Sequence, residues 1–129
     1  MNFREIYVDI DQSFETFNSS RTAMFIRANV VLYNSRGNNK IDRIDIRRSS
    51  SGNVHLKIFL NLPVDFLGMM VLRSLMHDDV YRMAIDLRRS YFQGEQETNR
   101  IFSSKWKDGK EYRAGEWQRW DWKIMEALK

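Results

Sequence analysis

The chain contains no cysteine, which excludes disulfide bonds and thiolate metal sites. With only two histidines among 129 residues, a zinc site made entirely of protein ligands is not expected either. No internal repeat, low-complexity tract or linker interrupts the sequence. We therefore expect one domain over residues 1–129, with a sheet-and-helix core over about 3–100 and a C-terminal hairpin and helix over about 101–128.

Long hydrophobic runs are also missing. No apolar stretch approaches the roughly 18 residues of a membrane-spanning helix, and the N-terminus lacks the pattern of a secretory signal. We therefore expect a soluble, cytoplasmic protein without a membrane partner. What is present is 43% hydrophobic and 13% aromatic residues, as in folded globular proteins, and a net charge of +4. That charge mildly favours a polyanionic partner such as nucleic acid.

Hydrophobic spacing divides the chain into expected elements. Alternation predicts strands over Phe3 to Asp11, Ile41 to Arg48 and Val54 to Leu60. Helical spacing predicts a helix over Thr22 to Tyr33, one opened by Pro63, and one over Val80 to Tyr91 with Val80, Met83, Ala84 and Leu87 inward. Asp108-Gly109 predicts a hairpin turn between Ile101 to Trp106 and Glu111 to Trp117, before a closing helix over Trp120 to Leu128.

The resulting order, strand–helix–strand–strand–helix–strand, predicts an α+β fold of the ferredoxin-like or RNA-recognition-motif-like sandwich type. One sheet face should form the core, with Ile6, Val8, Ile10, Ile44, Ile46, Val54, Leu56 and Ile58. The opposite face should be an open, charged surface with Tyr7, Asp9, Asp11, Arg43, Asp45, Arg47, His55, Lys57 and Phe59. An antiparallel sheet can leave one face to solvent, so charge there is not by itself proof of function.

Two acids stand close together at the end of the first predicted strand, in Ile6-Tyr7-Val8-Asp9-Ile10-Asp11. Because strand side chains alternate between faces, Asp9 and Asp11 share one face. Two such acids repel each other, whereas a divalent metal beside a triphosphate requires closely spaced carboxylate oxygens. The pair therefore indicates either a metal site or the solvent face of a half-buried edge strand.

Three motifs together carry a family resemblance. Val8-Asp9-Ile10-Asp11 is a strand ending in hydrophobic-Asp-hydrophobic-Asp, and Ser50-Ser51-Gly52-Asn53-Val54-His55 is a Ser/Gly turn leading to a histidine on the next strand. Asp86 is a later acid that follows apolar residues. In this order, over roughly Tyr7 to Arg89, the sequence resembles the archaeo-eukaryotic primase superfamily, the primase-polymerases. Because the first predicted strand begins at Phe3, we expect a minimal, accessory or degenerate relative.

The resemblance implies a nucleic-acid-associated protein of DNA replication, in a mobile element or virus, with metal-dependent nucleotidyl transfer either retained or lost. The catalytic, metal-binding residues it implies are Asp9, Asp11 and Asp86, with Mg²⁺ or Mn²⁺. The residues it implies for a nucleoside triphosphate are Ser51, Gly52, His55 and Lys57, with turn N–H groups facing phosphate oxygens. For Asp86 the alternative is an ordinary helix-face acid paired with Arg82 and Arg89.

Three other interpretations remain open. The first is a non-catalytic nucleic-acid-binding module whose residues would be Arg43, Arg47, Lys57, Tyr7 and Phe59. The second is a rolling-circle endonuclease with Tyr81 or Tyr91 as nucleophile, although Lys57 stands where a second metal-binding histidine would be expected. The third concerns the Trp-rich C-terminus, which either binds nucleic acid through its interleaved cations or supplies apolar anchors for packing or a homo-oligomer.

Overall fold

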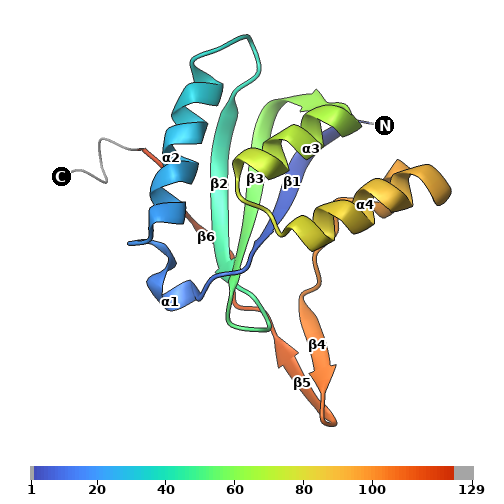
Figure 1. Ribbon diagram of the computed structural model, residues 1–129. Coiled ribbons are helices and arrows are strands. Elements are labelled where there is room, and N and C mark those ends of the chain that lie inside the picture. The colour runs from blue at the N-terminus through green and yellow to red at the C-terminus, as the bar shows by residue number, and fades with distance from the viewer. Residues whose placement is uncertain (1, 124–129) are drawn as a thin grey trace.

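Four strands form one antiparallel sheet in the order β1-β3-β2-β6 (Figure 1). The computed structural model describes residues 2–123 of this α+β chain. The sheet strands are β1 (Phe3–Ile10), β2 (Ile41–Arg48), β3 (Val54–Val64) and β6 (Gln118–Arg119). A separate two-stranded sheet consists of β4 (Ser104–Lys107) and β5 (Lys110–Arg113). The helices are α1 (Phe14–Phe17), α2 (Arg21–Asn34), α3 (Phe66–Leu75) and α4 (Val80–Phe92), with a 3₁₀ turn η1 (Glu95–Glu97).

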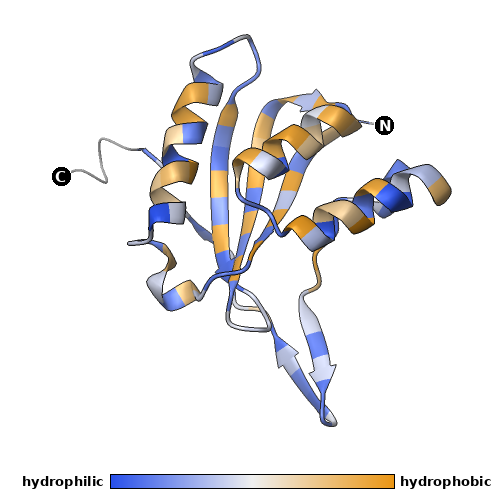
Figure 2. Cartoon of the chain, in the orientation of Figure 1, coloured by the Kyte–Doolittle hydropathy of each residue, from blue (hydrophilic) through white to orange (hydrophobic). Residues whose placement is uncertain are grey.

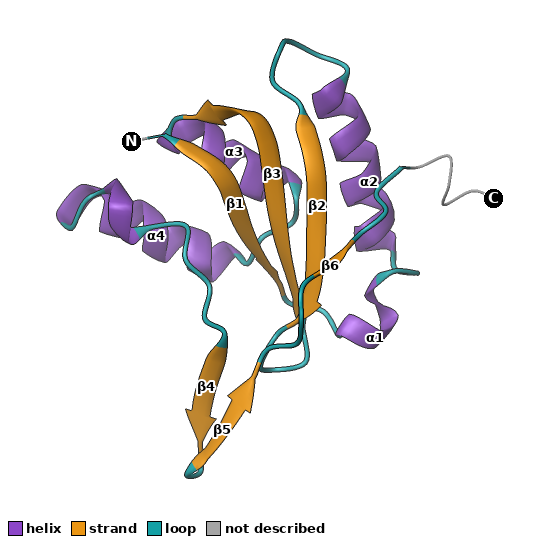
Figure 3. Ribbon diagram, turned by 180° about the vertical axis from the view of Figure 1, so that it is seen from behind, coloured by secondary structure: helices purple, strands orange, loops and turns teal. Residues whose placement is uncertain are grey.

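The hydrophobic core lies between one sheet face and two helices. Helix α2 packs on β2, and α3 packs on β1 and β3, so both cover the same face (Figures 1 and 3). Hydrophobic and hydrophilic residues alternate along the strands beneath them (Figure 2). The predicted core residues Ile6, Val8, Ile10, Ile44, Ile46, Val54, Leu56 and Ile58 are all buried. The alternation in the sequence therefore identified the core face correctly.

The prediction that Pro63 opens a helix is wrong. Strand β3 runs through Pro63 to Val64, and α3 begins at Phe66 after the N-cap Asp65. The carboxylate of Asp65 accepts the backbone N–H of Gly68 at 2.8 Å, as a helix N-cap does. Proline also restricts the residue before it to extended backbone, which suits the end of a strand.

Helix α4 does not bury the residues predicted to face inward. The side chain of Val80 is 78% exposed and that of Leu87 58% exposed, while the buried residue of α4 is Asp86. Figure 1 shows α4 standing beside the β1 edge of the sheet, apart from the core face. Ion pairs, described below, hold it there in place of an apolar stripe.

The C-terminal segment also differs from its prediction. The Asp108-Gly109 turn is confirmed, with positive φ at both positions (53° and 75°), as a type I′ hairpin requires. The hairpin forms its own sheet, and β6 joins the main sheet beside β2. In the predicted closing helix, residues 120–123 are not helical, and 124–128 lie outside the described residues.

Trp120 anchors this segment to the body of the protein. Its ring is buried and lies 5.7 Å from that of Phe17, with the Arg27 guanidinium 4.7 Å above it. Its backbone N–H donates to Ile44 O at 2.9 Å. Trp120 is therefore a packing anchor within the chain.

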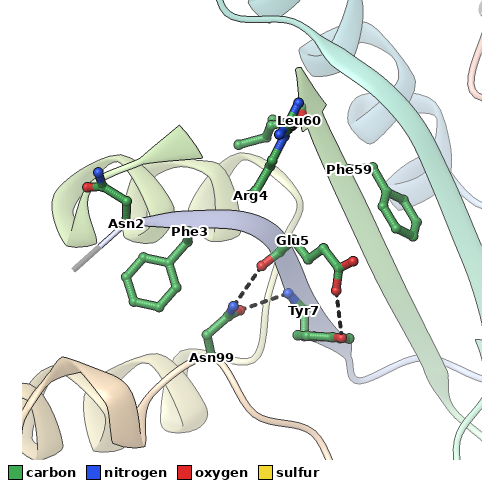
Figure 4. A pocket seen from close by; sticks show the side chains of 8 residues that line it. All are labelled: Asn2, Phe3, Arg4, Glu5, Tyr7, Phe59, Leu60 and Asn99. Carbon is green, nitrogen blue, oxygen red and sulfur yellow. Dashed lines mark hydrogen bonds between the residues drawn. The ribbon is translucent and has the colours of Figure 1, made fainter. Parts of the chain in front are cut away.

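The outer edge of β1 is satisfied by side chains where a further strand could have paired. Asn99 accepts the N–H of Tyr7 at 2.9 Å and donates to the carbonyl of Glu5 at 2.8 Å (Figure 4). Arg82 donates to the carbonyl of Tyr7 at 3.0 Å and to the carboxylate of Asp78 at 2.6 Å. These bonds satisfy the polar groups of an edge strand and block its pairing with another chain.

A buried ion network ties this edge to the helices. The guanidinium of Arg73 is fully buried and donates to the carboxylates of Asp78 and Asp86. Asp78 in turn accepts the backbone N–H of Asp9 at 2.8 Å, and the N–H of Asp79 donates to Asp9 O at 2.8 Å. Arg73 therefore holds the loop that fixes the end of β1.

We expect Arg73→Met to lower the free energy of unfolding by about 3–5 kcal/mol, because it leaves the Asp78 and Asp86 carboxylates buried without their central cation. The matched control is Arg89→Met. Arg89 pairs with Asp86 at 3.7 Å with its side chain 44% exposed, so its loss should cost less than about 1 kcal/mol. Urea denaturation measures both, and equal losses would contradict the central role of Arg73.

Candidate functional site

Cross-strand register places Asp9, His55 and Arg47 in one row across the sheet. Asp9 on β1 pairs with His55 on β3, and Arg47 on β2 pairs with the same His55. Directly opposed residues of neighbouring strands project to the same face. All three therefore lie on the face opposite the helices, as the alternation predicted.

Arg47 fixes the tautomer of His55. Its Nε–H donates to His55 Nδ1 at 3.0 Å, so Nδ1 must be an acceptor and the ring proton must be on Nε2. Nε2 faces Asp9, 3.9 Å from Oδ1. Burial, together with the charges of Arg47 and Arg82, lowers the pKa of His55 to about 4. At neutral pH the site therefore presents an uncharged imidazole N–H next to a carboxylate.

Asp9 has the opposite perturbation. Its pKa is raised to about 6, mainly by burial. The charge of Arg82 lowers this pKa, and the charges of Asp78, Asp79 and Asp11 raise it. Its side chain is still 36% exposed, so the carboxylate reaches solvent. Asp9 is thus a carboxylate whose negative charge the surrounding protein only partly compensates, and this is the environment in which a cation would be stabilised.

A cavity of about 350 Å³ opens in front of this pair. Its lining residues come from the end of β1, the turn between β2 and β3, the loop before α4, and the C-terminal hairpin with the loop before it: Asp9, Asp11, Ser49, Ser50, Ser51, Asn53, His55, Asp79, Phe102, Ser104 and Lys105. Asp11 is held there by Asn53, whose Nδ2 donates to its carboxylate at 3.1 Å. Among these residues, the permanent cation is Lys105, and the acids are Asp9, Asp11 and Asp79.

The serine turn is satisfied by its own hydroxyl and carbonyl. Ser49 Oγ accepts the backbone N–H of Ser51 at 3.3 Å and that of Asn53 at 2.9 Å, and Ser49 O accepts that of Gly52 at 2.9 Å. Gly52 has φ +87°, which this tight turn requires. Because these amides already have acceptors, contacts to a phosphate would have to come from side chains. Ser51 Oγ accepts from Lys105 Nζ at 2.8 Å, which brings one such cation to the turn.

The structure brings together only part of the predicted site. Asp9, Asp11, Ser51 and His55 line the cavity. Asp86 does not, because its carboxylate is buried against Arg73 at 2.7 Å. Gly52 lies in the turn behind the lining residues, and Lys57 lies over the rings of Tyr7, Phe59 and Trp117, outside the cavity.

The sequence did not predict two of the charged residues that line the cavity, Asp79 and Lys105. Asp79 is the N-cap of α4, where its carboxylate accepts the N–H of Tyr81 at 2.8 Å, and this capping role hides it as a site residue. Lys105 lies in the hairpin, far along the chain from Ser51. No spacing in the sequence links Lys105 to the turn, so only the folded chain could reveal it.

The sheet face opposite the helices was predicted to be open, but Trp117 covers part of it. The ring of Trp117 lies 4.3 Å from the Arg47 guanidinium and 6.5 Å from the ring of Tyr7. Arg47 is consequently only 8% exposed. Tyr7 and Phe59 line a separate groove of about 540 Å³ beside the β1 edge (Figure 4). Arg43, also predicted for nucleic-acid binding, pairs with Asp45 at 2.7 Å.

The donor atoms suit a metal that arrives with a ligand better than a resident one. Over residues 2–123, no three histidine or acidic side chains are grouped so that they could hold a metal ion alone. Mg²⁺ in proteins is usually bound through one or two carboxylates completed by substrate phosphates and water. Asp9 and Asp11 supply oxygen donors of this kind in the cavity.

Comparisons with known proteins found no match among family models, curated proteins or solved structures. Within the described part of the chain, the helices are too short or too polar to cross a membrane. The site is therefore interpreted from its own geometry.

We expect Asp9 and His55 to titrate in reversed order, with the carboxyl near pH 6 and the imidazole near pH 4. The ¹³C shift of the Asp9 carboxyl and the ¹⁵N shifts of His55 measure both transitions. At pH 7 the ¹⁵N pattern should be that of the neutral Nε2–H tautomer. An Nδ1–H tautomer, or protonation of His55 above that of Asp9, would contradict the arrangement.

The raised pKa of Asp9 also sets a pH dependence of stability. Between pH 3.8, the ordinary pKa of an aspartate, and about pH 6, Asp9 is protonated in the folded chain and ionised in the unfolded chain. This contribution is present at low pH and is lost as pH rises through 6. Asp9→Asn should therefore gain stability relative to the wild type as pH increases from about 4 to about 6. Urea denaturation across this range measures the difference, and a difference independent of pH would refute it.

Proposed function

We propose that the cavity formed by Asp9, Asp11, His55 and Lys105 binds a divalent metal together with a nucleoside triphosphate, in a protein related to primase-polymerase cores. The observation that carries the proposal is the convergence of these residues, from three separate segments, on one cavity. Oxygen donors for a metal and nitrogen donors for phosphate are thus within a single ligand's reach.

The charges in the cavity support a ligand containing both a cation and an anion. The cavity lining contains three acids, Asp9, Asp11 and Asp79, and one permanent cation, Lys105. A divalent cation would offset the burial of the Asp9 carboxylate and the repulsion from neighbouring acids, which together raise the pKa of Asp9. When bound, such a metal supplies neutralisation of phosphate charge and a lower pKa for a coordinated hydroxyl.

The chain's own donors complete the match to phosphate. His55 is uncharged and offers its Nε2–H as a hydrogen-bond donor. A protonated imidazolium would instead attract the neighbouring carboxylate of Asp9 strongly. Lys105 offers an ammonium near Ser51 and can turn from that hydroxyl toward a phosphate oxygen. Asp9 and Asp11 would hold the metal, and His55 and Lys105 the phosphates.

The strand arrangement is compatible with the ferredoxin-like or RNA-recognition-motif-like sandwich of the primase-polymerases. The order β1-β3-β2, with α2 and α3 on one face, is the order such a sheet has over three strands. Here the side chains of Asn99 and Arg82 occupy the β1 edge where a fourth strand would pair. We therefore propose a minimal relative in which Asp9 and Asp11 hold the metal and Asp86 takes no part, with Asp79 as a further acid in the cavity lining.

The non-catalytic nucleic-acid-binding module is less well supported. That function requires accessible cations and aromatic rings on the sheet face. Arg47 is buried beneath Trp117 and bonded to His55. Arg43 is half exposed, but its guanidinium pairs with Asp45 at 2.7 Å. The side chain of Lys57 is only 22% exposed, and the rings of Tyr7 and Phe59 beneath it are half-buried.

We expect Mg²⁺ or Mn²⁺ with a nucleoside triphosphate to raise the melting temperature of the wild type, because a ligand that binds only the folded chain stabilises it. The gain is about 2.7 kcal/mol at a ligand concentration one hundred times the dissociation constant. Asp9→Asn should lose this ligand-induced rise. Differential scanning fluorimetry with metal alone, nucleotide alone and both together measures it.

The matched control is Asp42→Asn, which removes an exposed acid from β2 outside the cavity. It should retain the full rise. No rise in the wild type, or an equal rise in Asp9→Asn, would overturn the proposal. A rise dependent on Asp9 would justify assays of primer synthesis and extension.

A further inference from the structure

The hairpin β4–β5 projects from the body of the protein (Figures 1 and 3). Trp106 is 71% exposed, and Lys107 and Lys110 are exposed on either side of the turn. Over residues 2–123, β4 and β5 pair with each other and with no further strand, so sheet packing does not account for these side chains. An exposed ribbon of this composition therefore requires another explanation.

The two faces of the hairpin differ in charge. Cross-strand pairs Lys105 with Tyr112 and Lys107 with Lys110 project to one face, called here the lysine face. The pairs Ser104 with Arg113 and Trp106 with Glu111 project to the other. The second face contains an acid, which pairs with Arg113 at 2.9 Å. The lysine face carries three cations and no acid.

Repulsion between the lysines of the lysine face lowers the stability of the hairpin when no ligand is bound. Lys107 and Lys110 stand directly opposite each other, and like charges in such a pair repel. Across residues 2–123, none of the three lysines forms an ion pair with an acid. A polyanion lying along the face would convert this repulsion into attraction. Lys110 Nζ lies 5.2 Å from the ring centre of Tyr112, whose ring is 40% exposed and provides a stacking surface.

The lysine face leads directly to the candidate site. Lys105, at its base, lines the cavity and donates to Ser51 at 2.8 Å. Lys107 lies two residues further out on β4, and Lys110 stands directly opposite Lys107 on β5, next to the turn. Residues two apart on a strand are separated by about 6.7 Å, comparable to the spacing of neighbouring phosphates in an extended nucleic-acid strand. The lysine face therefore links the solvent to the cavity.

We infer that the lysine face binds the sugar–phosphate backbone of a single nucleic-acid strand and directs that strand to the cavity of Asp9 and His55. That the strand is directed to the cavity rests on the proposed function, whereas binding of the strand depends on the hairpin alone. Lysines contact phosphates without regard to base sequence, and Tyr112 can stack on a base of any kind. Binding should therefore be salt-sensitive and weakly sequence-dependent.

The test is fluorescence anisotropy with a labelled oligothymidylate strand at several salt concentrations. Each lysine–phosphate contact contributes about 0.7 to the slope of log K against log salt for single strands. Lys107→Ala should reduce the slope by about 0.7, and Lys107→Ala with Lys110→Ala by about 1.4. Arg113→Ala is the matched control, because it also removes one cation from the hairpin but from the opposite face. It should leave the slope unchanged.

Equal losses for Lys107→Ala and Arg113→Ala would indicate attraction by overall charge and would overturn the inference, as would an unchanged slope in the double variant. Polyglutamate binding with the same dependence on Lys107, without oligothymidylate binding, would assign the face to an acidic protein and also overturn it. With a single strand of RNA, the lysine variants should reduce the salt-dependence slope by the same amount as with DNA. The metal–nucleotide melting assay on the double variant is a separate readout: an Asp9-dependent rise there tests the cavity, whereas strand binding tests the hairpin.

Discussion

The fully buried guanidinium of Arg73 is the interaction on which the arrangement of this protein depends. It joins Asp78, in the loop after α3, to Asp86, the buried residue of α4. Burying three charges is costly unless each is paired and hydrogen-bonded, so the network fixes one geometry for these segments. Without it, α4 has few apolar contacts to hold it at the sheet edge, because most of its large apolar side chains are exposed.

That constraint extends to the candidate site through the backbone. Asp78 accepts the N–H of Asp9, and Asp79 donates to its carbonyl, so the loop acts as a short substitute for a neighbouring strand. The same loop introduces Asp79 into the cavity. A structural ion network and a cluster of partly compensated carboxylates thus adjoin each other, with Arg82 contributing to both through its charge. The stability of the edge and the electrostatics of the site are consequently coupled.

The residues predicted for the site differ in whether the structure places them at the cavity. Asp9 and His55 were identified from strand alternation and a turn, because these are local patterns that translate directly into a shared sheet face. Asp86 was misplaced because an acid after apolar residues looks the same in a metal site and in a buried ion pair. Its partner, Arg73, lies on another helix, and no local pattern links the two. Only the tertiary structure therefore distinguishes a metal site from a buried ion pair at Asp86.

The sequence by itself determined β1, β2 and most of β3, the core face, the hairpin turn and the shared face of Asp9 and His55, because each follows from short-range periodicity and backbone preference. Only the tertiary structure decided that Trp117 covers Arg47, that Lys105 lines the cavity, and that α4 is held by Asp86. These features depend on contacts between residues far apart along the chain. Their energies come from burial and from charge pairing, which the folded arrangement creates and which no window of sequence contains.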